Sequence, residues 1–447
     1  MSNVTPLKEV QNNFALIELA GQFYILNRKQ IKQLIHGDIY IAIRYYKEKE
    51  GKLVIRRFIE AQAHGLQDKE VNALLFDFMK STNTLLYTSV AFDPRPQPAN
   101  VLNLWRPHAI EAKEGSWDII DDFLFDIICN KDHTNYKFLM YYIAHMLQKP
   151  EQKPMVAVIL LGGQGIGKGA FYTLLKTIWR YTMRQVHSID DVVGTFTASA
   201  LEGTLAIWMD EALFSGDKKS MDRLKALISE DEVTIEEKYQ PKRSMRSVHR
   251  IFGASNHEHF GNIERDDRRF FFLKVSEAWK QDDAKFSPLF KSFEDGKTVS
   301  AFVSYLLKRD IKDFKPFRDR PKTTEHAKQK VHSLEGLDRF LYEVLQAAEV
   351  DSQYIGGGAK IWNGSLVIST KDLKSAYIDY DRTAQRYRPI SEAKMKPELL
   401  KIFPTAEATR FTEHNRSKRG ISFGSIQQSR TDFDHYIGCE VDWDELP

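Results

Sequence analysis

An apolar run, a glycine-rich loop and a lysine follow one another in the middle of the chain. Residues 158–161 are four aliphatic residues of the kind that form a buried parallel strand, and residues 170–175 have helical character. Glycines allow the loop between them to curl so that several backbone N–H groups face one phosphate, at the positive end of the helix. Lys168 adds a charge for the outer phosphates. This order predicts a nucleoside triphosphate site in an α/β fold, although a glycine-rich strand–helix turn without a ligand has the same outline.

The loop fits the phosphate-binding pattern G-x-x-x-x-G-K-[ST] except at its last position. Gly169 stands where a hydroxyl usually contacts Mg²⁺, and Thr173 is a more distant helper. The predicted nucleotide-binding residues are Gly162, Gly163, Gln164, Gly165, Ile166, Gly167, Lys168, Gly169 and Ala170. The expected ligands are ATP and Mg²⁺.

The composition is that of an ordinary soluble globular protein. The 447 residues are 42% hydrophobic and 28% charged, which suits two to four domains. The net charge of +3 is too small to establish a nucleic-acid partner, so a basic surface would be local. Cys129 and Cys439 are too few for a zinc ribbon or a disulfide framework. No signal peptide and no apolar stretch long enough to cross a bilayer is present, so a cytoplasmic protein without a membrane partner is expected.

The chain is predicted to divide into four segments. They are an α+β N-terminal domain (1–110), a helical segment (111–150), an ATPase core with a parallel sheet (151–315), and a mostly helical C-terminal domain (316–447). In the first, we expect strands at 14–19, 22–26, 39–44 and 53–55, a helix at 69–81 and a proline-rich end at 93–98.

Helical spacing marks residues 116–147, with core candidates Phe123, Ile127, Phe138, Tyr142 and Met146. From there to about residue 280, strands alternate with helices, which predicts a parallel sheet covered on both faces. Further helices are expected at 287–310, 338–348, 370–382 and 391–402. Short strands after the last of them are compatible with a winged helix.

Two acids end the apolar run at residues 205–209. Asp210 is placed to hold Mg²⁺ and its waters, and Glu211 to align and deprotonate the water that attacks the γ-phosphate. Acid pairs also occur as solvated strand ends. After a phosphate loop, the functional interpretation is favoured.

Polar residues also flank the next two apolar runs. Asn256 follows the run at residues 250–255 and is a candidate to hold the attacking water, although asparagine is also a common turn residue. Arg268 and Arg269 precede the apolar run at residues 270–273. They suit surface ion pairs, or a finger that reaches the γ-phosphate of a neighbouring subunit.

Between the acids and Asn256, residues 233–247 read as a strand, a basic proline turn and a returning strand. Lys238, Tyr239, Lys242 and Arg243 offer phosphate contacts and one stacking ring to DNA. A solvated hairpin without a ligand is the alternative.

This order of motifs resembles the superfamily 3 helicases, a viral and plasmid branch of the AAA+ ATPases, and is most similar to phage and plasmid primase-helicases. The resemblance covers about residues 115–280 and extends loosely beyond them. It implies a homo-hexameric ring that hydrolyses ATP at subunit interfaces and moves on single-stranded or forked DNA, usually 3′ to 5′, in the cytoplasm of a bacterial or archaeal host. It also implies that Lys168 binds the β- and γ-phosphates, Asp210 and Glu211 are the Walker B pair, Asn256 is the sensor, Arg268 or Arg269 is the finger, and the 233–247 hairpin is the pore loop. Loops ending Gly-Lys-Gly also occur in this family.

The flanking segments carry weaker signals. The first 110 residues lack a recognisable primase, which makes a separate primase or polymerase a candidate partner and a collar or oligomerisation domain the expected role. Basic residues gather at 382–388 and at Arg410, Arg416, Lys418 and Arg419, where a winged helix would contact DNA or a neighbouring subunit.

Two other functions share parts of this pattern. Adenylate kinases also have a Gly-Lys-Gly loop, but with a threonine where this chain has Ala170, and they begin near the loop. A DNA-binding ATPase that serves as a replication initiator or defence factor without unwinding would carry the same motifs as a helicase.

Overall fold

The computed structural model describes residues 6–36, 43–62, 66–210, 218–238, 242–257, 260–351, 358–383 and 390–443. The chain forms two compact units. The first comprises residues 1–258 and 269–321, and the second comprises residues 259–268 and 322–447. Among the described residues predicted for the nucleotide site, Arg268 belongs to the second unit and the others belong to the first.

The first unit begins with a four-stranded sheet of order β3-β2-β1-β4. Its strands are β1 (Phe14–Leu19), β2 (Gln22–Asn27), β3 (Tyr46–Lys47) and β4 (Leu86–Tyr87), and its helices are α1 (Pro6–Asn13), α2 (Arg28–His36), α3 (Glu48–Gln62) and α4 (Asp68–Lys80). The predicted hairpin is confirmed, since β1 and β2 are antiparallel around Ala20 and Gly21, which both have positive φ. The predicted helix at 69–81 corresponds to α4.

Two expectations for this region are wrong. Leu53–Ile55 is not a strand but part of α3, where Gly51, Ile55 and Ile59 are buried at helical spacing. The proline-rich segment at 93–98 does not end the structure of this region, because it connects β5 (Ser89–Ala91) to its parallel partner β6 (Val101–Asn103). The strand expected at 39–44 falls mainly on residues outside the described part.

The predicted helical segment forms three consecutive helical elements. It contains α5 (Asp118–Asp122), the π-helix η1 (Phe123–Ile128) and α6 (His133–Gln148). All five predicted core residues are buried: Phe123, Ile127, Phe138, Tyr142 and Met146. Asp132 caps α6, because its side chain accepts a hydrogen bond from Asn135 N.

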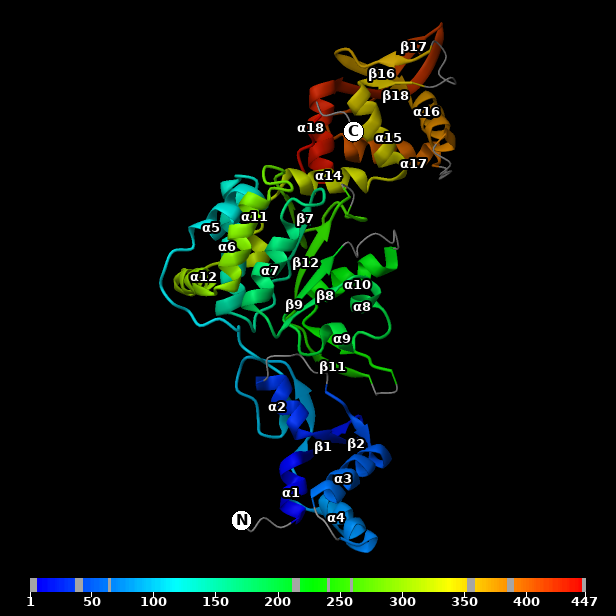
Figure 1. Ribbon diagram of the computed structural model, residues 1–447. Coiled ribbons are helices and arrows are strands. Elements are labelled where there is room, and N and C mark those ends of the chain that lie inside the picture. Colours follow the sequence, from blue (N-terminus) through cyan, green and yellow to red (C-terminus); the bar gives the residue numbers. More distant parts are fainter. Residues whose placement is uncertain are drawn as a thin grey trace. The chain divides into compact units, whose positions relative to one another are not determined.

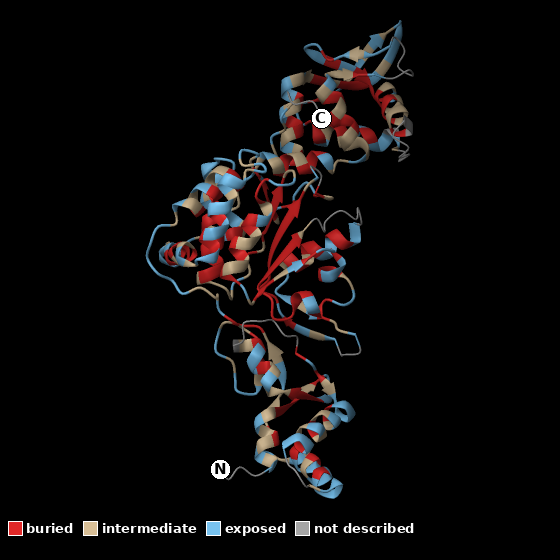
Figure 2. Cartoon of the chain, viewed as in Figure 1, coloured by how far each residue is buried: buried red, intermediate tan, exposed pale blue. Residues whose placement is uncertain are grey.

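The centre of the first unit is a five-stranded parallel sheet of order β13-β7-β12-β9-β8. Its strands are β7 (Ala157–Leu161), β8 (Met183–Val186), β9 (Ala206–Asp210), β12 (Arg250–Ser255) and β13 (Phe270–Lys274). In Figure 2 these strands are buried along most of their length, as expected for a sheet with both faces covered. The predicted parallel sheet is therefore confirmed.

Helices cover both faces of this sheet. They are α7 (Lys168–Ile178), α8 (Asp190–Val193), α9 (Ala198–Leu201), α10 (Lys218–Ser229), α11 (Asp283–Glu294) and α12 (Lys297–Lys308), followed by α13 (Pro316–Asp319). Figure 1 shows α6, α7, α11 and α12 on one side of the sheet and α8, α9 and α10 on the other. Asp295 and Gly296 interrupt the predicted helix at 287–310, which is two helices.

The second unit is a mixture of helices and small antiparallel sheets. Its helices are α14 (Thr324–His332), α15 (Gly336–Ala347), α16 (Thr370–Thr383), α17 (Glu392–Ile402) and α18 (Ile426–Ile437), and its strands are β14 (Glu349–Val350), β15 (Lys360–Ile361), β16 (Ser365–Ser369), β17 (Glu407–Glu413) and β18 (Arg416–Ser425). A core that includes Leu345, Ile368, Leu399 and Phe433 holds them together. The three helices predicted from sequence are present, whereas α14, β14, β15, β16 and α18 are additional.

Within the part of the chain that the structure describes, no helix is both long enough and apolar enough to span a lipid bilayer.

Candidate nucleotide-binding site

The glycine loop joins the end of β7 directly to the start of α7. Gly162, Gly165 and Gly167 have positive φ, and Gly167 is the N-cap of the helix that begins at Lys168. A Cβ at Gly167 would lie 3.1 Å from the Phe123 ring and 3.3 Å from the Phe286 ring. Both the backbone conformation and the space at this position therefore require glycine. The loop brings backbone N–H groups to the positive end of α7, which suits an anion.

Lys168 is held at the mouth of this loop. Its ammonium group donates to the carbonyl oxygens of Gly162 and Gly163, the second at 2.6 Å, and to Asn256 Oδ1 at 2.6 Å. Asn256 follows β12, the strand next to β7 in the sheet. Two residues 88 positions apart, both singled out from sequence, therefore lie in direct contact.

Asp210 ends β9, on the far side of β12 from β7, and pairs in register with Ala254. Its Oδ2 accepts a hydrogen bond of 2.9 Å from Gln185 Nε2, which belongs to the segment at the end of β8. Burial, together with the charge of Asp210, raises the pKa of the Tyr172 hydroxyl on α7. Sequence reasoning did not single out Gln185, because a lone glutamine on a short strand carries no pattern.

Gly169 leaves open space beside the first turn of α7. A Cβ at this position would have no heavy atom within 4 Å. The Thr173 hydroxyl donates to the Gly169 carbonyl at 2.9 Å, so its hydrogen bond is made within α7 and not to the loop. The suggestion that Thr173 replaces the missing loop hydroxyl is therefore not supported by this geometry.

Of the three remaining predicted catalytic residues, the structure describes Arg268 and Arg269. Glu211 lies in the 211–217 gap, outside the described residues. Arg268 belongs to the second unit and is exposed, whereas Arg269 belongs to the first unit and is half-buried at the start of β13.

The predicted basic hairpin consists of β10 (Glu232–Ile235) and β11 (Arg243–Arg246), which pair antiparallel. Lys238 and Lys242 are exposed, and Tyr239 lies outside the described residues. Lys242 forms an ion pair with Glu236 at 2.7 Å. The two lysines therefore remain candidates for phosphate contact.

Arg243 does not suit the DNA-contact role predicted for it. Its side chain is 10% exposed, forms a 2.6 Å ion pair with Glu202, and lies with Cζ 5.1 Å from the centre of the Tyr45 ring. The Tyr45 hydroxyl donates to the same Glu202 carboxylate at 3.1 Å, and burial together with this carboxylate raises the pKa of Tyr45. Arg243 thus anchors the hairpin to Glu202, which follows α9, and to Tyr45 from the N-terminal region.

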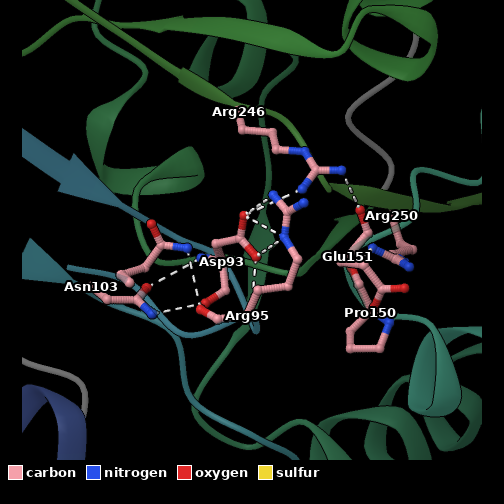
Figure 3. Close-up of polar contacts among 8 residues, drawn as sticks. Asp93, Arg95, Asn103, Pro150, Glu151, Arg246 and Arg250 are labelled. Carbon is pink, nitrogen blue, oxygen red and sulfur yellow. Dashed lines mark hydrogen bonds and ion pairs between the residues drawn. The ribbon is translucent and has the colours of Figure 1, made fainter. Parts of the chain in front are cut away.

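A second arginine group anchors the same hairpin, as Figure 3 shows. Arg246 donates to Asp93 Oδ2 at 3.2 Å and to the Glu151 carbonyl at 2.9 Å. Asp93 also pairs with Arg95, and the hydrogen bonds from Arg95 lower the pKa of Asp93 to about 2. The carboxylate therefore stays charged between two guanidinium groups.

Arg250, the first residue of β12, is fully buried in a nest of carbonyl oxygens. Its guanidinium donates to the carbonyls of Lys149, Pro150 and Gln152, in the segment that leads from α6 to β7. Burial lowers its pKa to about 10. These hydrogen bonds hold the segment before β7 against β12.

Asp210 is the predicted magnesium ligand among the described residues. Mg²⁺ is usually held by one or two carboxylates together with waters and substrate phosphates. Asp210, the last residue of β9, is one such carboxylate, and no cluster of three or more His, Cys, Asp or Glu side chains exists among the described residues that would form a site made of protein groups alone.

Four of the basic residues singled out in the second unit lie on the β17–β18 hairpin. Arg410, Arg416 and Arg419 are exposed there, and Arg410 lies opposite Arg419. Lys418 instead bonds Asp372 and Glu413. The basic segment at 382–388 falls outside the described side chains.

Comparison with known proteins supports the fold. Residues 160–269, which include the loop, Asp210 and Asn256, match a family of unknown function (DUF5906). Three solved structures of the NrS-1 C-terminal region, two of them described as residues 305–718, have the same fold. One has a TM-score of 0.62 at 16% identity and covers 95% of this chain and 100% of its own. The others have TM-scores of 0.61 and 0.59 at 15% and 14% identity, each covering 94% of this chain and 99% of its own. No curated protein matches the sequence.

Proposed function

We propose that this chain is a DNA-translocating ATPase, a helicase of a phage or plasmid replication system that works as a homo-hexameric ring. The observation that carries the proposal is the contact of Lys168 with Asn256 at the carboxyl edge of the parallel sheet. In open α/β sheets, ligands bind outside the carboxyl ends of the strands where the strand order reverses. Here β7 is the first strand of the sheet in sequence and lies between the last two.

The loop suits the recognition of phosphates. Its backbone N–H groups and the start of α7 attract an anion, and Lys168 is already directed to the same place by two carbonyls and Asn256. A bound triphosphate would exchange these contacts for its own oxygens. Mg²⁺, held by Asp210, would neutralise charge on the phosphates.

Hydrolysis is favoured over transfer to a second nucleotide. Asn256 touches the lysine that would hold the γ-phosphate, which is the position from which an amide can orient an attacking water. Glu211 directly follows Asp210 in sequence and is the proposed base. The exposed side chain of Arg268 is the better candidate for a finger to a neighbouring subunit, since Arg269 is half-buried.

DNA contact is proposed for two surfaces. Lys238 and Lys242 are exposed near the tip of the β10–β11 hairpin. Arg410, Arg416 and Arg419 are exposed on the β17–β18 hairpin, which is preceded by β16, α16 and α17 in the order expected of a winged helix. Cations on a projecting hairpin suit the phosphate backbone, which is read without sequence preference.

The test is ATP turnover with and without single-stranded DNA, together with strand displacement on a forked substrate. Turnover of ATP to ADP and phosphate, stimulated by DNA and coupled to unwinding, is expected for the wild type and absent from Lys168→Ala. DNA-stimulated turnover without unwinding would instead favour an initiator or defence ATPase. Full affinity of Lys168→Ala for ATP would remove the site assignment, and a monomer that stays active in solution would contradict the ring.

A further inference from the structure

The order of the strands sets the orientation of a triphosphate bound at the proposed site. Asn256 and Asp210 would surround the γ-phosphate. Asn256 follows β12 and Asp210 is the last residue of β9, and both strands lie on one side of β7. β13 pairs with β7 on the opposite side. A triphosphate lying on the loop with its γ end toward β12 therefore has its nucleoside end toward β13.

The segment that follows β13 lies along the glycine loop. Val275 N donates to the Leu161 carbonyl at 2.9 Å, and Gln281 N donates to the Gly165 carbonyl at 3.0 Å. A Cβ at Gly163 would lie 3.6 Å from the Glu277 carboxylate and 4.0 Å from Lys280 Nζ. Residues 275–281 thus form the wall of the loop on the side where the nucleoside would leave.

Residues 275–281 include one aromatic residue, Trp279. The Trp279 ring centre lies 6.0 Å from that of Phe123, with the planes 31° apart, and 5.8 Å from that of Phe286. Phe286, on α11, is the residue whose ring lies against Gly167. Trp279 and Phe286 are half-buried, so the indole, which packs on the buried Phe123, keeps part of its surface open to solvent. The Lys285 ammonium lies 5.8 Å from the centre of the indole ring. Large rings in such a position, beside a phosphate loop, suit a flat ligand.

We infer that Trp279 forms the base-stacking side of the nucleotide site and selects purine nucleotides. This inference rests on the proposed function, since it assigns the base subsite of the same nucleotide. Every base has a π-face, but a two-ring purine covers more of an indole than a one-ring pyrimidine does. Stacking does not read the edge of the base, so Trp279 separates purines from pyrimidines rather than ATP from GTP.

The experiment measures binding of ATP, CTP and inorganic tripolyphosphate to the full chain by calorimetry in the presence of Mg²⁺. The wild type should bind ATP more tightly than CTP. Trp279→Ala should weaken ATP binding about tenfold and reduce the preference over CTP, because one stacked base contributes about this much. Binding of tripolyphosphate, which has no base, should stay unchanged. Trp279→Phe should restore most of the ATP affinity, since a ring is present again.

Phe290→Ala is the matched control, because Phe290 is an exposed aromatic on the same helix as Phe286 and its ring centre lies 6.4 Å from that of Phe286. It should bind all three ligands as the wild type does. Unchanged ATP affinity in Trp279→Ala overturns the inference and leaves the proposed function standing. Equal loss of ATP and tripolyphosphate overturns it too, because Trp279 would then only support the loop. A wild type that binds none of the three rejects the proposed function itself.

Discussion

The ammonium group of Lys168 lies 2.6 Å from Oδ1 of Asn256, so the glycine loop and the end of the strand beside it are joined by a polar contact. This contact makes the two roles separable by mutation. Asn256→Ala should keep ATP binding, because Lys168 and the loop amides remain. It should lower turnover about 10²–10³-fold, the usual effect of removing one preorganised group from a reaction site. Binding and single-turnover hydrolysis, measured side by side, check this.

Asn256→Asp is the informative companion variant. A carboxylate at this position would hold Lys168 in an ion pair and repel the γ-phosphate, so ATP binding itself should weaken. If Asn256→Asp bound ATP as tightly as Asn256→Ala does, Asn256 would not lie beside the terminal phosphate.

Gly169 offers a test of the metal shell. The space beside it is open and its φ lies outside the positive range, so serine fits there without strain. Gly169→Ser should lower the Mg²⁺ concentration needed for half-maximal turnover about fivefold, the equivalent of ~1 kcal/mol for one added polar contact. Gly169→Ala is the control and should leave the Mg²⁺ requirement unchanged. A similar shift in both variants would mean that the added hydroxyl does not reach the metal.

The site that sequence reasoning could find is made of local patterns at the ends of strands. Gly162–Lys168, Asp210 and Asn256 each follow an apolar run, and parallel strands bring such ends to one edge of a sheet. Burial could also be predicted from a local pattern in residues 116–147, because the helical spacing identified five core residues correctly.

What could not be predicted depends on contacts distant in sequence. Arg243 looked like a DNA-binding residue because its neighbours are basic, but its partners Glu202 and Tyr45 lie 41 and about 200 positions away. Leu53–Ile55 has strand-like composition, yet burial of Ile55 and Ile59 on one face makes it a helix. Trp279 carries no pattern of its own and becomes informative only where β13 delivers it to the loop.

The anchoring of the hairpin predicts a division of roles between neighbouring cations. Glu202→Gln would leave the Arg243 charge buried without its partner and should lower the free energy of unfolding by about 3–5 kcal/mol. Lys242→Gln, at an exposed position, should leave stability unchanged and weaken binding of single-stranded DNA regardless of sequence. Denaturant unfolding and DNA binding of both variants distinguish the roles. Unchanged stability of Glu202→Gln would show that the ion pair does not anchor the hairpin.

Two buried histidines should make the first unit sensitive to mild acid. Burial lowers the pKa of His145 to about 3 and that of His249 to about 4, whereas an exposed histidine in the unfolded chain titrates near 6.5. The unfolded chain therefore binds more protons below pH 6.5. The contribution of each histidine to the free energy of unfolding is fully present above this pH. It is lost as the pH falls toward 4 for His249 and toward 3 for His145. The loss is about 1.4 kcal/mol per pH unit for each histidine.

Urea unfolding at pH 7 and pH 5 measures this loss, and His145→Phe isolates one part of it. A phenylalanine fills the same space against Phe314, whose ring centre lies 6.2 Å from that of His145, and cannot bind a proton. The decrease in stability between the two pH values should be smaller in this variant by about the share of one histidine. His187→Gln, at an exposed position in the same unit, should show the decrease of the wild type. An equal decrease in His145→Phe and the wild type would mean that His145 is protonated in the folded protein, and therefore reaches solvent.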